Sequence, residues 1–360
     1  MNEIVRNVLK QFSLSGFEAY IVGGYVRDYL LGEESNDVDI CTNALPKDIL
    51  KIFEMEQIDF EDYRAVQLKK GKYFFDITTY RKEIRYENRK PVEIVYIHNL
   101  LDDLKRRDFK MNTLCMNEEG KIIDPYLGTK DISERLISTV GDAYEKLEED
   151  PLRILRALRF AITLDFELDA SLKKAIMLTN DLVLTLSKER IKKELDQMFL
   201  SKYTEKIFPT LEEYGILELC DLKPVSNFVF VEDICGIWAQ IETGIDYSFS
   251  KQEKKNIEII RNLINKGTIE DIDLFDDDFY LCQVAGKILG IDCIELQEQY
   301  QSLPIHAESE LTVSIEEMLS VGVETTELAK MRKELTLMII TKMLRNEKTE
   351  LVNYLKHNAF

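Results

Sequence analysis

The sequence predicts an α+β protein, in which an amino-terminal part built on a mixed sheet with helices precedes an all-α remainder. Up to about residue 140, short segments with strand-like alternation, such as DVDICT (37–42), are interspersed with helical segments. After about residue 148 the strand signal fades and the long segments have helical spacing, as in EDPLRILRALRFAITL (149–164). The chain contains no internal repeat and no low-complexity linker. We therefore expect a head at 1–140, a helical neck at 141–205 and a helical body and tail at 206–360.

The individual elements follow from the spacing of apolar residues and from turn residues. In chain order these signals predict a helix at 1–12, a strand at 19–23, a helix at 25–31, a strand at 37–42, two strands joined by a Lys-Gly turn within 66–80, a strand at 92–98, and helices at 99–104 and 108–116. Further helices are predicted at 149–164, 170–186, 188–200 and 203–217 and through 250–360, with a break at the acidic run EDIDLFDDDF (270–279).

The composition restricts the classes of function. Six cysteines include no C-x-x-C pair and lie in apolar runs, which predicts buried, reduced thiols in a cytosolic protein. Three scattered histidines argue against a His-rich metal site and against an HD-type phosphohydrolase, so a bound metal would be a hard ion held by carboxylates. The chain shows no apolar run long enough for a membrane span and no signal-peptide pattern at its start, so we expect a cytoplasmic protein without a membrane partner.

The distribution of charge along the chain is compatible with a nucleic-acid partner. The formal net charge is −19, and residues 222–360 carry 14 Lys and Arg against 24 Asp and Glu. Residues 64–110, in contrast, carry 13 Lys and Arg against 7 Asp and Glu. Because a phosphate-binding surface needs positive charge only where it touches the backbone, the acidic total weakens an RNA hypothesis without removing it.

Two aspartates mark the candidate centre of chemistry. Asp37 and Asp39 lie two residues apart on a predicted strand, so their carboxylates share one face, roughly 7 Å apart along the strand. Carboxylates this close repel each other unless a cation lies between them, and a pair of Mg²⁺ ions roughly 4 Å apart would suit this face. Asp76, on a later predicted strand, is a candidate third carboxylate. The ordinary alternative is that such a pair is only an edge-strand charge or a turn signal.

A glycine pair precedes these aspartates. Gly23 and Gly24 end a predicted strand, and a turn without Cβ atoms lets backbone N–H groups approach phosphate oxygens. Arg27 follows in a helical turn and is able to bind the same phosphates with its guanidinium. Twelve residues separate Gly24 from Asp37, enough for a helix that returns the chain beside the turn.

These residues carry a family resemblance. AYIVGGYVRDYLLGEESNDVDICTNALP (19–46) resembles the signature of the polymerase-beta nucleotidyltransferase superfamily, and in particular class II tRNA nucleotidyltransferases (the CCA-adding enzymes) and bacterial poly(A) polymerases. Further matches follow in the family's order at TTYRKEIRYENRKP (78–91), DDLKRRDFKMNTLCM (102–116), DPYLGTKDI (124–132), EDPLRILRALRF (149–160) and SKERIKKEL (187–195). The resemblance is close from about residue 15 to 200 and thins after about 220. It implies a polymerase-beta-like nucleotidyltransferase head followed by an all-α neck, body and tail.

The resemblance also implies a protein template that selects the nucleotide base. Asp150 and Arg153 match the family's template pair, and a carboxylate with a guanidinium suits CTP and ATP while rejecting UTP and GTP. Arg156 and Arg159 would hold that pair or contact phosphate. The ordinary alternatives are that Asp150 and Pro151 begin a helix and that the arginines form a solvated face.

A second matching motif lies in KRRDFKMN (105–112). Arg107 matches a position that contacts the nucleotide in the family, and Asp108 and Asn112 would contact the ribose or fix Arg107. Alternatively, Asp108 caps the helix predicted at 108–116. We expect Arg106 to face solvent or RNA.

The resulting hypothesis is an enzyme that adds or repairs the 3′ CCA end of tRNA from CTP and ATP with Mg²⁺ and releases pyrophosphate. The acceptor stem and 3′ end would lie along the basic head residues Lys69, Lys70 and Arg89 and along the helices after 150. The segment 60–68 lacks the glycine-containing loop that relatives use in switching from C to A addition. An enzyme restricted to CC or A addition, or a poly(A) polymerase, therefore stays an alternative, as does a catalytically silent RNA-binding module.

Overall fold

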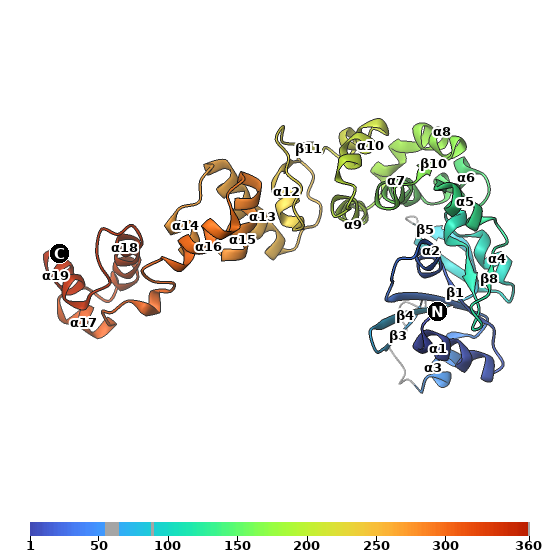
Figure 1. Ribbon diagram of the computed structural model, residues 1–360, viewed down its shortest axis with the longest axis horizontal. Coiled ribbons are helices and arrows are strands. Elements are labelled where there is room, and N and C mark those ends of the chain that lie inside the picture. The colour runs from blue at the N-terminus through green and yellow to red at the C-terminus, as the bar shows by residue number, and fades with distance from the viewer. Residues whose placement is uncertain (55–64, 88–89, 359–360) are drawn as a thin grey trace. The chain divides into compact units, whose positions relative to one another are not determined.

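The computed structural model describes residues 1–54, 65–87 and 90–358, which form two compact units, Met1–Cys220 and Asp221–Phe360 (Figure 1). The first unit combines a mixed sheet with helices and the second is mainly helical, which confirms the predicted fold class. The predicted head and neck both lie within the first unit, and the domain boundaries at residues 140 and 205 stay predictions. In the described part of the chain, no helix is both long enough and apolar enough to cross a membrane.

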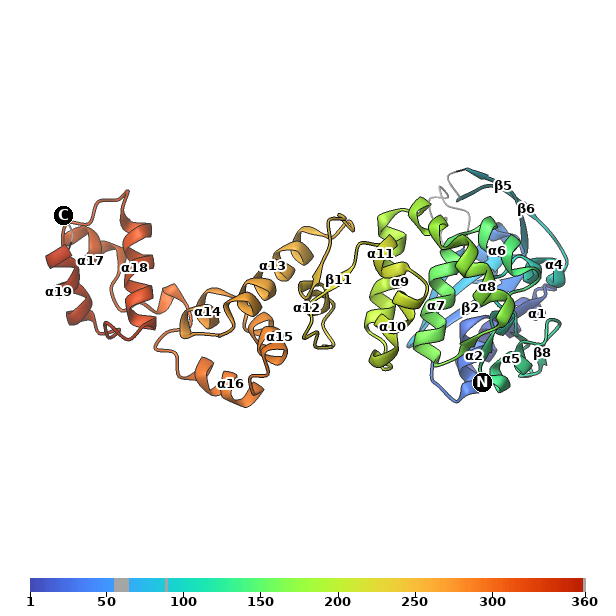
Figure 2. The same ribbon diagram turned by 90° about the horizontal axis from the view of Figure 1, so that it is seen from above.

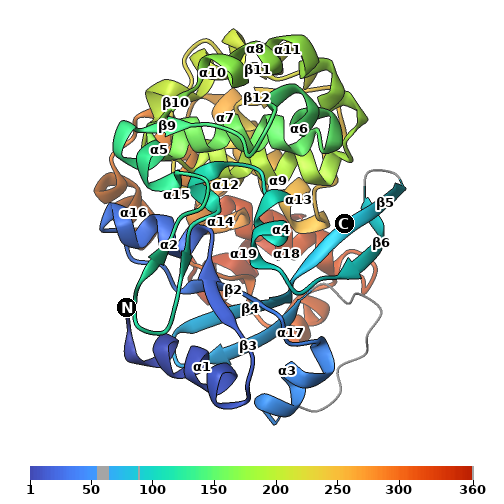
Figure 3. The same ribbon diagram turned by 90° about the vertical axis from the view of Figure 1, so that its right-hand side faces the viewer.

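The first unit is organised around a six-stranded sheet with the strand order β3-β4-β2-β1-β7-β8. Its strands are β1 (Ala19–Val22), β2 (Asp37–Thr42), β3 (Val66–Lys70), β4 (Tyr73–Thr79), β7 (Cys115–Met116) and β8 (Ile122–Ile123). β2 and β4 run parallel, whereas the other neighbours pair antiparallel, so the sheet is mixed as predicted. β5 (Arg81–Glu87) and β6 (Lys90–Tyr96) pair separately as a two-stranded antiparallel sheet that extends away from the main one (Figure 3).

One face of this sheet is the core of the head. Alternation along β2 and β4 buries Val38, Ile40, Phe75 and Ile77 on that face, each at most 1% exposed. Helix α1 (Glu3–Leu14) contacts the sheet with an apolar stripe that includes Phe12, and its first turn is capped by Asn2, whose side chain accepts a hydrogen bond from the Ile4 N–H. The opposite face of the sheet is polar and carries the candidate catalytic residues.

Short helices connect the strands of the head. They are α2 (Gly24–Leu31), α3 (Pro46–Ile52), α4 (Leu100–Lys105), the 3₁₀ turn η1 (Lys110–Asn112) and α5 (Gly128–Glu134). The helix predicted at 108–116 is wrong, because this segment consists of η1 followed by β7. Phe109, Met111, Leu114, Cys115 and Met116 are all fully buried, and a run that is buried on every side carries no helical stripe to distinguish it from a turn and a strand.

The carboxyl-terminal part of the first unit is helical. It comprises α6 (Ala143–Glu149), α7 (Leu152–Leu164), α8 (Ala170–Thr179), η2 (Asn180–Thr185), α9 (Lys188–Phe199), η3 (Thr204–Lys206), α10 (Ile207–Glu213) and α11 (Ile216–Leu219), with one two-residue strand pair, β9 (Leu136–Ile137) and β10 (Glu167–Leu168). α7 is its central helix, because Ile154, Leu155, Leu158 and Ile162 are fully buried against its neighbours. This helix carries the three arginines of the EDPLRILRALRF motif.

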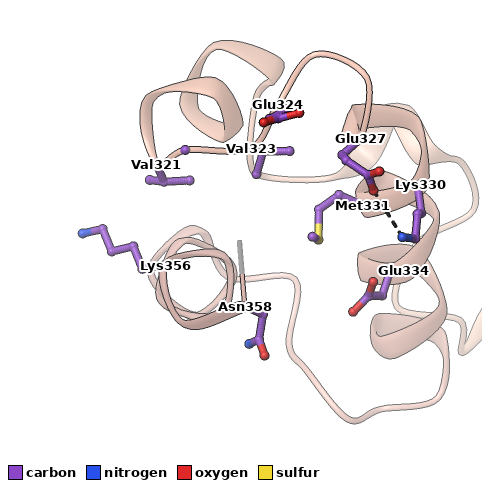
Figure 4. A pocket seen from close by; sticks show the side chains of 10 residues that line it. Val321, Val323, Glu324, Glu327, Lys330, Met331, Glu334, Lys356 and Asn358 are labelled. Carbon is purple, nitrogen blue, oxygen red and sulfur yellow. Dashed lines mark ion pairs between the residues drawn. The ribbon is translucent and has the colours of Figure 1, made fainter. Parts of the chain in front are cut away.

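The second unit consists of helices with one short strand pair. Its elements are β11 (Lys223–Pro224), α12 (Ile234–Ala239), β12 (Ile241–Glu242), α13 (Lys251–Lys266), α14 (Asp271–Asp276), α15 (Phe279–Leu289), α16 (Cys293–Gln301), η4 (Glu308–Glu310), α17 (Ile315–Ser320), α18 (Leu328–Ile340) and α19 (Lys348–Asn358) (Figure 2). The predicted break at 270–279 is narrower than expected, because Asp271–Asp276 form α14 and only Asp277 and Asp278, both extended, separate it from α15. Leu274 of α14 is buried, and Glu270 and Asp273 cap its first turn. An open pocket of about 730 Å³ lies beside α18 and α19, with Glu324, Met331 and Lys356 among its lining residues (Figure 4).

The cysteines are unpaired, as predicted, and five of the six are buried. The exception is Cys293, which begins the short helix α16 and is exposed to solvent. The prediction of burial is therefore wrong at this one position: the apolar run around Cys293 is not itself buried, since Ile294 is 69% exposed and Leu296 is the buried residue of α16.

Candidate active site

The polar face of the sheet gathers three carboxylates. β2 and β4 pair in parallel with Asp39 opposite Asp76 and Asp37 opposite Phe74, so these four side chains project from the same face. Asp76 also accepts a hydrogen bond from Gln67 Nε2 on β3, at 3.0 Å. The sequence placed Asp37 and Asp39 on one face, and the strand register places Asp76 directly beside them.

The pKa of Asp39 reflects its burial and the charges that surround it. Burial of its carboxylate raises the pKa of Asp39 most, the neighbouring Asp76 and Asp37 raise it further, and Arg107 and Arg156 oppose the shift. The side chain of Asp39 nevertheless stays accessible to water, so its carboxylate is only partly desolvated. Within the described chain, no ion pair neutralises the carboxylate of Asp37 or Asp39.

An uncompensated carboxylate pair fits a hard divalent cation. Mg²⁺ typically uses one or two protein carboxylates and takes its remaining ligands from water and substrate phosphate. The residues that the structure describes include no group of three or more His, Cys, Asp or Glu side chains arranged to hold a metal ion. Two carboxylates on one sheet face, completed by water and substrate phosphate, suit a Mg²⁺ ion that arrives with a nucleotide.

The glycine turn lies against these carboxylates. Gly23 precedes α2 with φ of 79° and ψ of −130°, a conformation that glycine alone adopts without strain. A Cβ atom at this position would lie 3.6 Å from Asp39 Oδ2 and 3.7 Å from Arg107 Nη1. Gly23 thus keeps open the space between a carboxylate and a guanidinium, next to the amino-terminal N–H groups of α2.

Arg107 is the cation nearest to this space. Burial alone would lower the pKa of Arg107, but the charges of Asp103 and Asp39 raise it overall. Asp103 is fully buried and lies 3.5 Å from Arg107 Nη2 and 2.9 Å from Arg106 Nη2. The structure therefore ties Arg106 to Asp103, which the expectation that Arg106 faces solvent or RNA did not include. Sequence reasoning also missed Asp103, which lies on α4 four residues before Arg107, although Arg107 itself follows the end of that helix.

Asp108 joins the head to α7. Its carboxylate accepts hydrogen bonds from Arg156 Nη2 at 2.6 Å, Arg156 Nε at 2.8 Å, Asn112 Nδ2 at 3.1 Å and the Phe109 N–H at 2.8 Å. Burial would raise the pKa of Asp108, but the charge of Arg156 and these hydrogen bonds lower it to about 2. The Phe109 bond resembles the capping alternative, but the segment it precedes is only a 3₁₀ turn.

Asn112 extends this network to Arg27. Asn112 Oδ1 accepts a hydrogen bond from Arg27 Nη1 at 3.0 Å, and Asp28 Oδ1 accepts from Arg27 Nη2 and Nε at 2.7 and 2.9 Å. Among the described residues, no side-chain hydrogen bond links Asp108 or Asn112 to Arg107, so the structure does not show them fixing Arg107. The alternative, that they contact the ribose, stays a prediction. Arg27 is buried, and most of its donors are occupied.

Three arginines surround the ring of Phe160 on α7. The guanidinium carbons of Arg159, Arg27 and Arg156 lie 4.1, 5.1 and 5.4 Å from the ring centroid. Arg159 also donates to Glu194 on α9, with Nε at 2.6 Å from Oε2. The ordinary alternative of a solvated face does not hold for Arg156 and Arg159, because ion pairs and the ring of Phe160 hold them. No local sequence pattern marked Glu194 or Phe160 as their partners.

The side chains of the predicted template pair, Asp150 and Arg153, bind different partners in the structure. Arg153 is buried, and its guanidinium donates to the carbonyl oxygens of Lys146 and Arg106 and to Glu149 Oε2, at 2.8 to 2.9 Å. Asp150 accepts from the Leu152 N–H and lies 3.3 Å from Arg190 Nη2. The side chain of Asp150 thus caps the first turn of α7, although the helix itself begins after Pro151. The base-selecting role of both residues stays a prediction.

Comparisons with known proteins identify related domains and chains. Residues 19–138 match the family model described as the poly A polymerase head domain, and residues 165–220 match that described as the probable RNA and SrmB-binding site of polymerase A. The CCA-adding enzyme of Lactobacillus delbrueckii subsp. bulgaricus is 30% identical over 379 residues, covering 97% of this chain and 96% of the relative. The CCA-adding enzyme of Bacillus licheniformis is 33% identical over 347 residues, covering 87% of each protein.

Solved structures show the same fold. The Bacillus stearothermophilus CCA-adding enzyme in complex with CTP superposes with a TM-score of 0.84 at 24% identity, covering 99% of this chain and 98% of that one. The Thermotoga maritima CCA-adding enzyme complexed with tRNA-CCA gives a TM-score of 0.67 at 16% identity, covering 100% and 97%. The fold and the carboxylate site define a nucleotidyltransferase head with attached helices. Given the relatives that match over nearly its whole length, the chain belongs to the CCA-adding enzyme family.

Proposed function

We propose that this chain is a template-independent tRNA nucleotidyltransferase that builds or repairs the 3′-terminal CCA from CTP and ATP. The observation that carries the proposal is the joint placement of Asp37, Asp39 and Asp76 on one sheet face beside the Gly23 turn. Full-length similarity to CCA-adding enzymes supports the same activity, and the relative solved with tRNA-CCA supports tRNA as the partner.

The residues around the carboxylates would perform the transfer as follows. Asp37 and Asp39 would hold Mg²⁺, with Asp76 as a candidate third carboxylate, and when bound the ions stabilise negative charge on the attacking and leaving oxygens. The N–H groups after Gly23 and the guanidinium of Arg107 would bind the triphosphate. The RNA 3′ oxygen then bonds to the α-phosphorus, the bond to pyrophosphate breaks, and the hydroxyl proton leaves to a carboxylate or to water.

Base selection would depend on α7 and the residue that precedes it. Asp150 keeps part of its carboxylate exposed and is able to accept a hydrogen bond from the exocyclic amine of C or A. Arg153 would act indirectly, because its hydrogen bonds to two backbone carbonyls fix the position of the start of α7. The Asp108–Arg156 pair would hold α7 against the head, and the Arg159–Glu194 pair would hold it against α9.

The RNA would approach over the basic part of the head. Lys69 and Lys70 on β3 are candidates for backbone contacts, whereas Arg89 and residues 60–64 of the altered loop segment lie outside the described residues. We place the enzyme in the cytoplasm because its substrates are there. Restriction to CC or A addition is the main alternative, and the products formed from tRNAs of defined 3′ end distinguish it.

A pair of variants tests the catalytic assignment. Asp37→Asn and Asp39→Asn remove the negative charge that Mg²⁺ requires while keeping the side-chain shape, so nucleotide transfer should fall to background. Binding of tRNA, measured by gel shift without nucleotide, should stay close to wild type because neither carboxylate attracts phosphate. An equal loss of transfer and binding would overturn the metal assignment and indicate a folding role.

A further inference from the structure

An exposed aromatic ring lies beside the catalytic carboxylates. Phe74 is 51% exposed, whereas its neighbours Tyr73 and Phe75 are 6% and 1% exposed. The alternation of β4 directs Phe74 to the same face as Asp76, and the register with β2 places it opposite Asp37. A half-exposed phenylalanine on the polar face of a sheet contributes little to the core and leaves apolar surface open to a ligand.

A lysine accompanies this ring. Lys69 on β3 lies opposite Phe74 in the antiparallel register, and its Nζ is 4.8 Å from the ring centroid. The next pair on the same face is Gln67 with Asp76, joined by a hydrogen bond. Together, these residues form two adjacent rows: one cationic and aromatic, the other polar and acidic. A simple cross-strand pair would explain the Lys69–Phe74 contact but not the ring's position next to Asp37.

The sheet order indicates which substrate this row faces. The glycine turn that would bind the triphosphate follows β1, and β2 carries Asp37 and Asp39. Phe74 and Lys69 lie on β4 and β3, on the far side of β2 from the glycine turn. Phosphoryl transfer places the attacking and leaving oxygens roughly in line on opposite sides of the phosphorus. The attacking 3′-hydroxyl therefore approaches from the side of β4 and β3.

We propose that Phe74 and Lys69 form the binding subsite for the 3′-terminal nucleotide of the RNA that is being extended. The ring stacks on the terminal base, and the ammonium neutralises the adjoining phosphate. Two residues along β4, about 7 Å away, Asp76 faces the position of the 3′-hydroxyl, a separation that one nucleoside spans between its base and its 3′ oxygen. The inference rests on the proposed function, because it names the substrate group held at the same site.

Phe74→Leu tests the stacking by removing the ring while keeping an apolar side chain on the strand. Loss of one base–aromatic stack corresponds to a rise of about tenfold in the KM for a tRNA ending in C or CC, with little change in the KM for CTP. Tyr29→Leu is the matched control, because Tyr29 is 49% exposed on α2 and lies in another pocket, beside Met1 and Tyr73. Its kinetics should equal wild type.

A double-mutant cycle combines Phe74→Leu in the protein with a tRNA whose 3′-terminal nucleotide lacks its base. Wild type should bind this RNA about tenfold more weakly than the normal one, and Phe74→Leu should show little further loss. Lys69→Ala should lower the dependence of binding on salt by about one phosphate contact. Lys72→Ala, which removes an exposed lysine that also lies over an aromatic ring, should not.

The outcomes separate this inference from the proposed function. If wild type extends no tRNA with any nucleotide, the proposed function fails. If wild type extends tRNA normally but Phe74→Leu keeps its KM, or if the two losses in the cycle add independently, the subsite is wrong while the function stands. If wild type binds the tRNA that lacks its terminal base as tightly as the normal tRNA, the proposed subsite is wrong, even if Phe74→Leu does not fold.

Discussion

The ion pair between Asp108 and Arg156 makes a quantitative prediction about stability. Asp108→Asn removes the buried charge but keeps the size of the side chain. The pKa of Asp108 is lowered from its ordinary 3.8 to about 2, a shift worth about 2 kcal/mol of folding free energy at pH 7. We therefore expect the variant to lower the free energy of unfolding of the first unit by about 2 kcal/mol at neutral pH.

The sign of the pH dependence follows from the same shift. A carboxyl group whose pKa is lower in the folded state stabilises the protein above its unfolded-state pKa and loses that contribution as the pH falls through the folded-state value. The difference between wild type and Asp108→Asn should thus be constant above about pH 5, shrink to roughly half at pH 3, and vanish below pH 2. Asp131→Asn is the matched control, because burial raises the pKa of that equally buried aspartate, and the change in stability that it causes should move with pH in the opposite direction.

Urea denaturation at pH 7, 4 and 3 measures these differences. The chain has one tryptophan, Trp238, which lies in the second unit, so its fluorescence follows that unit while far-UV circular dichroism follows both. Asp108→Asn should shift the dichroism transition of the first unit and leave the Trp238 transition unchanged. A shift of equal size at pH 7 and pH 3, or one that moves the Trp238 transition as much, would refute the reasoning.

Three further predictions concern single positions. Gly23→Ala should reduce kcat/KM for nucleotides by at least tenfold, because the added Cβ strains the backbone and fills the space between Asp39 and Arg107. Gly32→Ala is the control, because Gly32 ends the same helix with a similar φ but has open space around it. This control should cost only about 1 kcal/mol of stability and leave activity unchanged. Asp150→Asn should relax discrimination against UTP and GTP at unchanged stability, whereas Arg153→Lys should lower the melting temperature, because lysine cannot replace three directed hydrogen bonds. Titration of native protein with a thiol reagent should modify one cysteine rapidly, and Cys293→Ser should abolish that phase.

Much of the head was predictable because its signals are local. Strand alternation fixed the face shared by Asp37 and Asp39, and the Gly-Gly turn after an apolar strand fixed the start of α2. The fold class and the family followed from motifs whose spacing is specific. These features depend on residues within a few positions of one another, so a single sequence contains them.

The partners of the arginines were not predictable in the same way. Arg156 binds Asp108 across 48 positions and Arg159 binds Glu194 across 35, and the sequence contains no signal for pairings at that distance. The position of Phe74 beside Asp37 depends on the parallel register of β2 with β4, which sequence patterns do not determine. Arginines at helical spacing left a solvated face open as the ordinary alternative, whereas in the structure Arg156 and Arg159 form ion pairs with carboxylates of other elements.

Primer extension on tRNA measures directly whether the proposed active site adds CCA. Purified protein with Mg²⁺ would be incubated with tRNA transcripts ending at the discriminator base, at C and at CC, with CTP, ATP, UTP and GTP supplied singly and in pairs. We expect extension that stops after CCA, with CTP used before ATP and with no use of UTP or GTP. Extension that stops at CC, addition of A alone, or a poly(A) product would contradict full CCA addition, and no extension of any transcript would contradict the assignment of the carboxylate site.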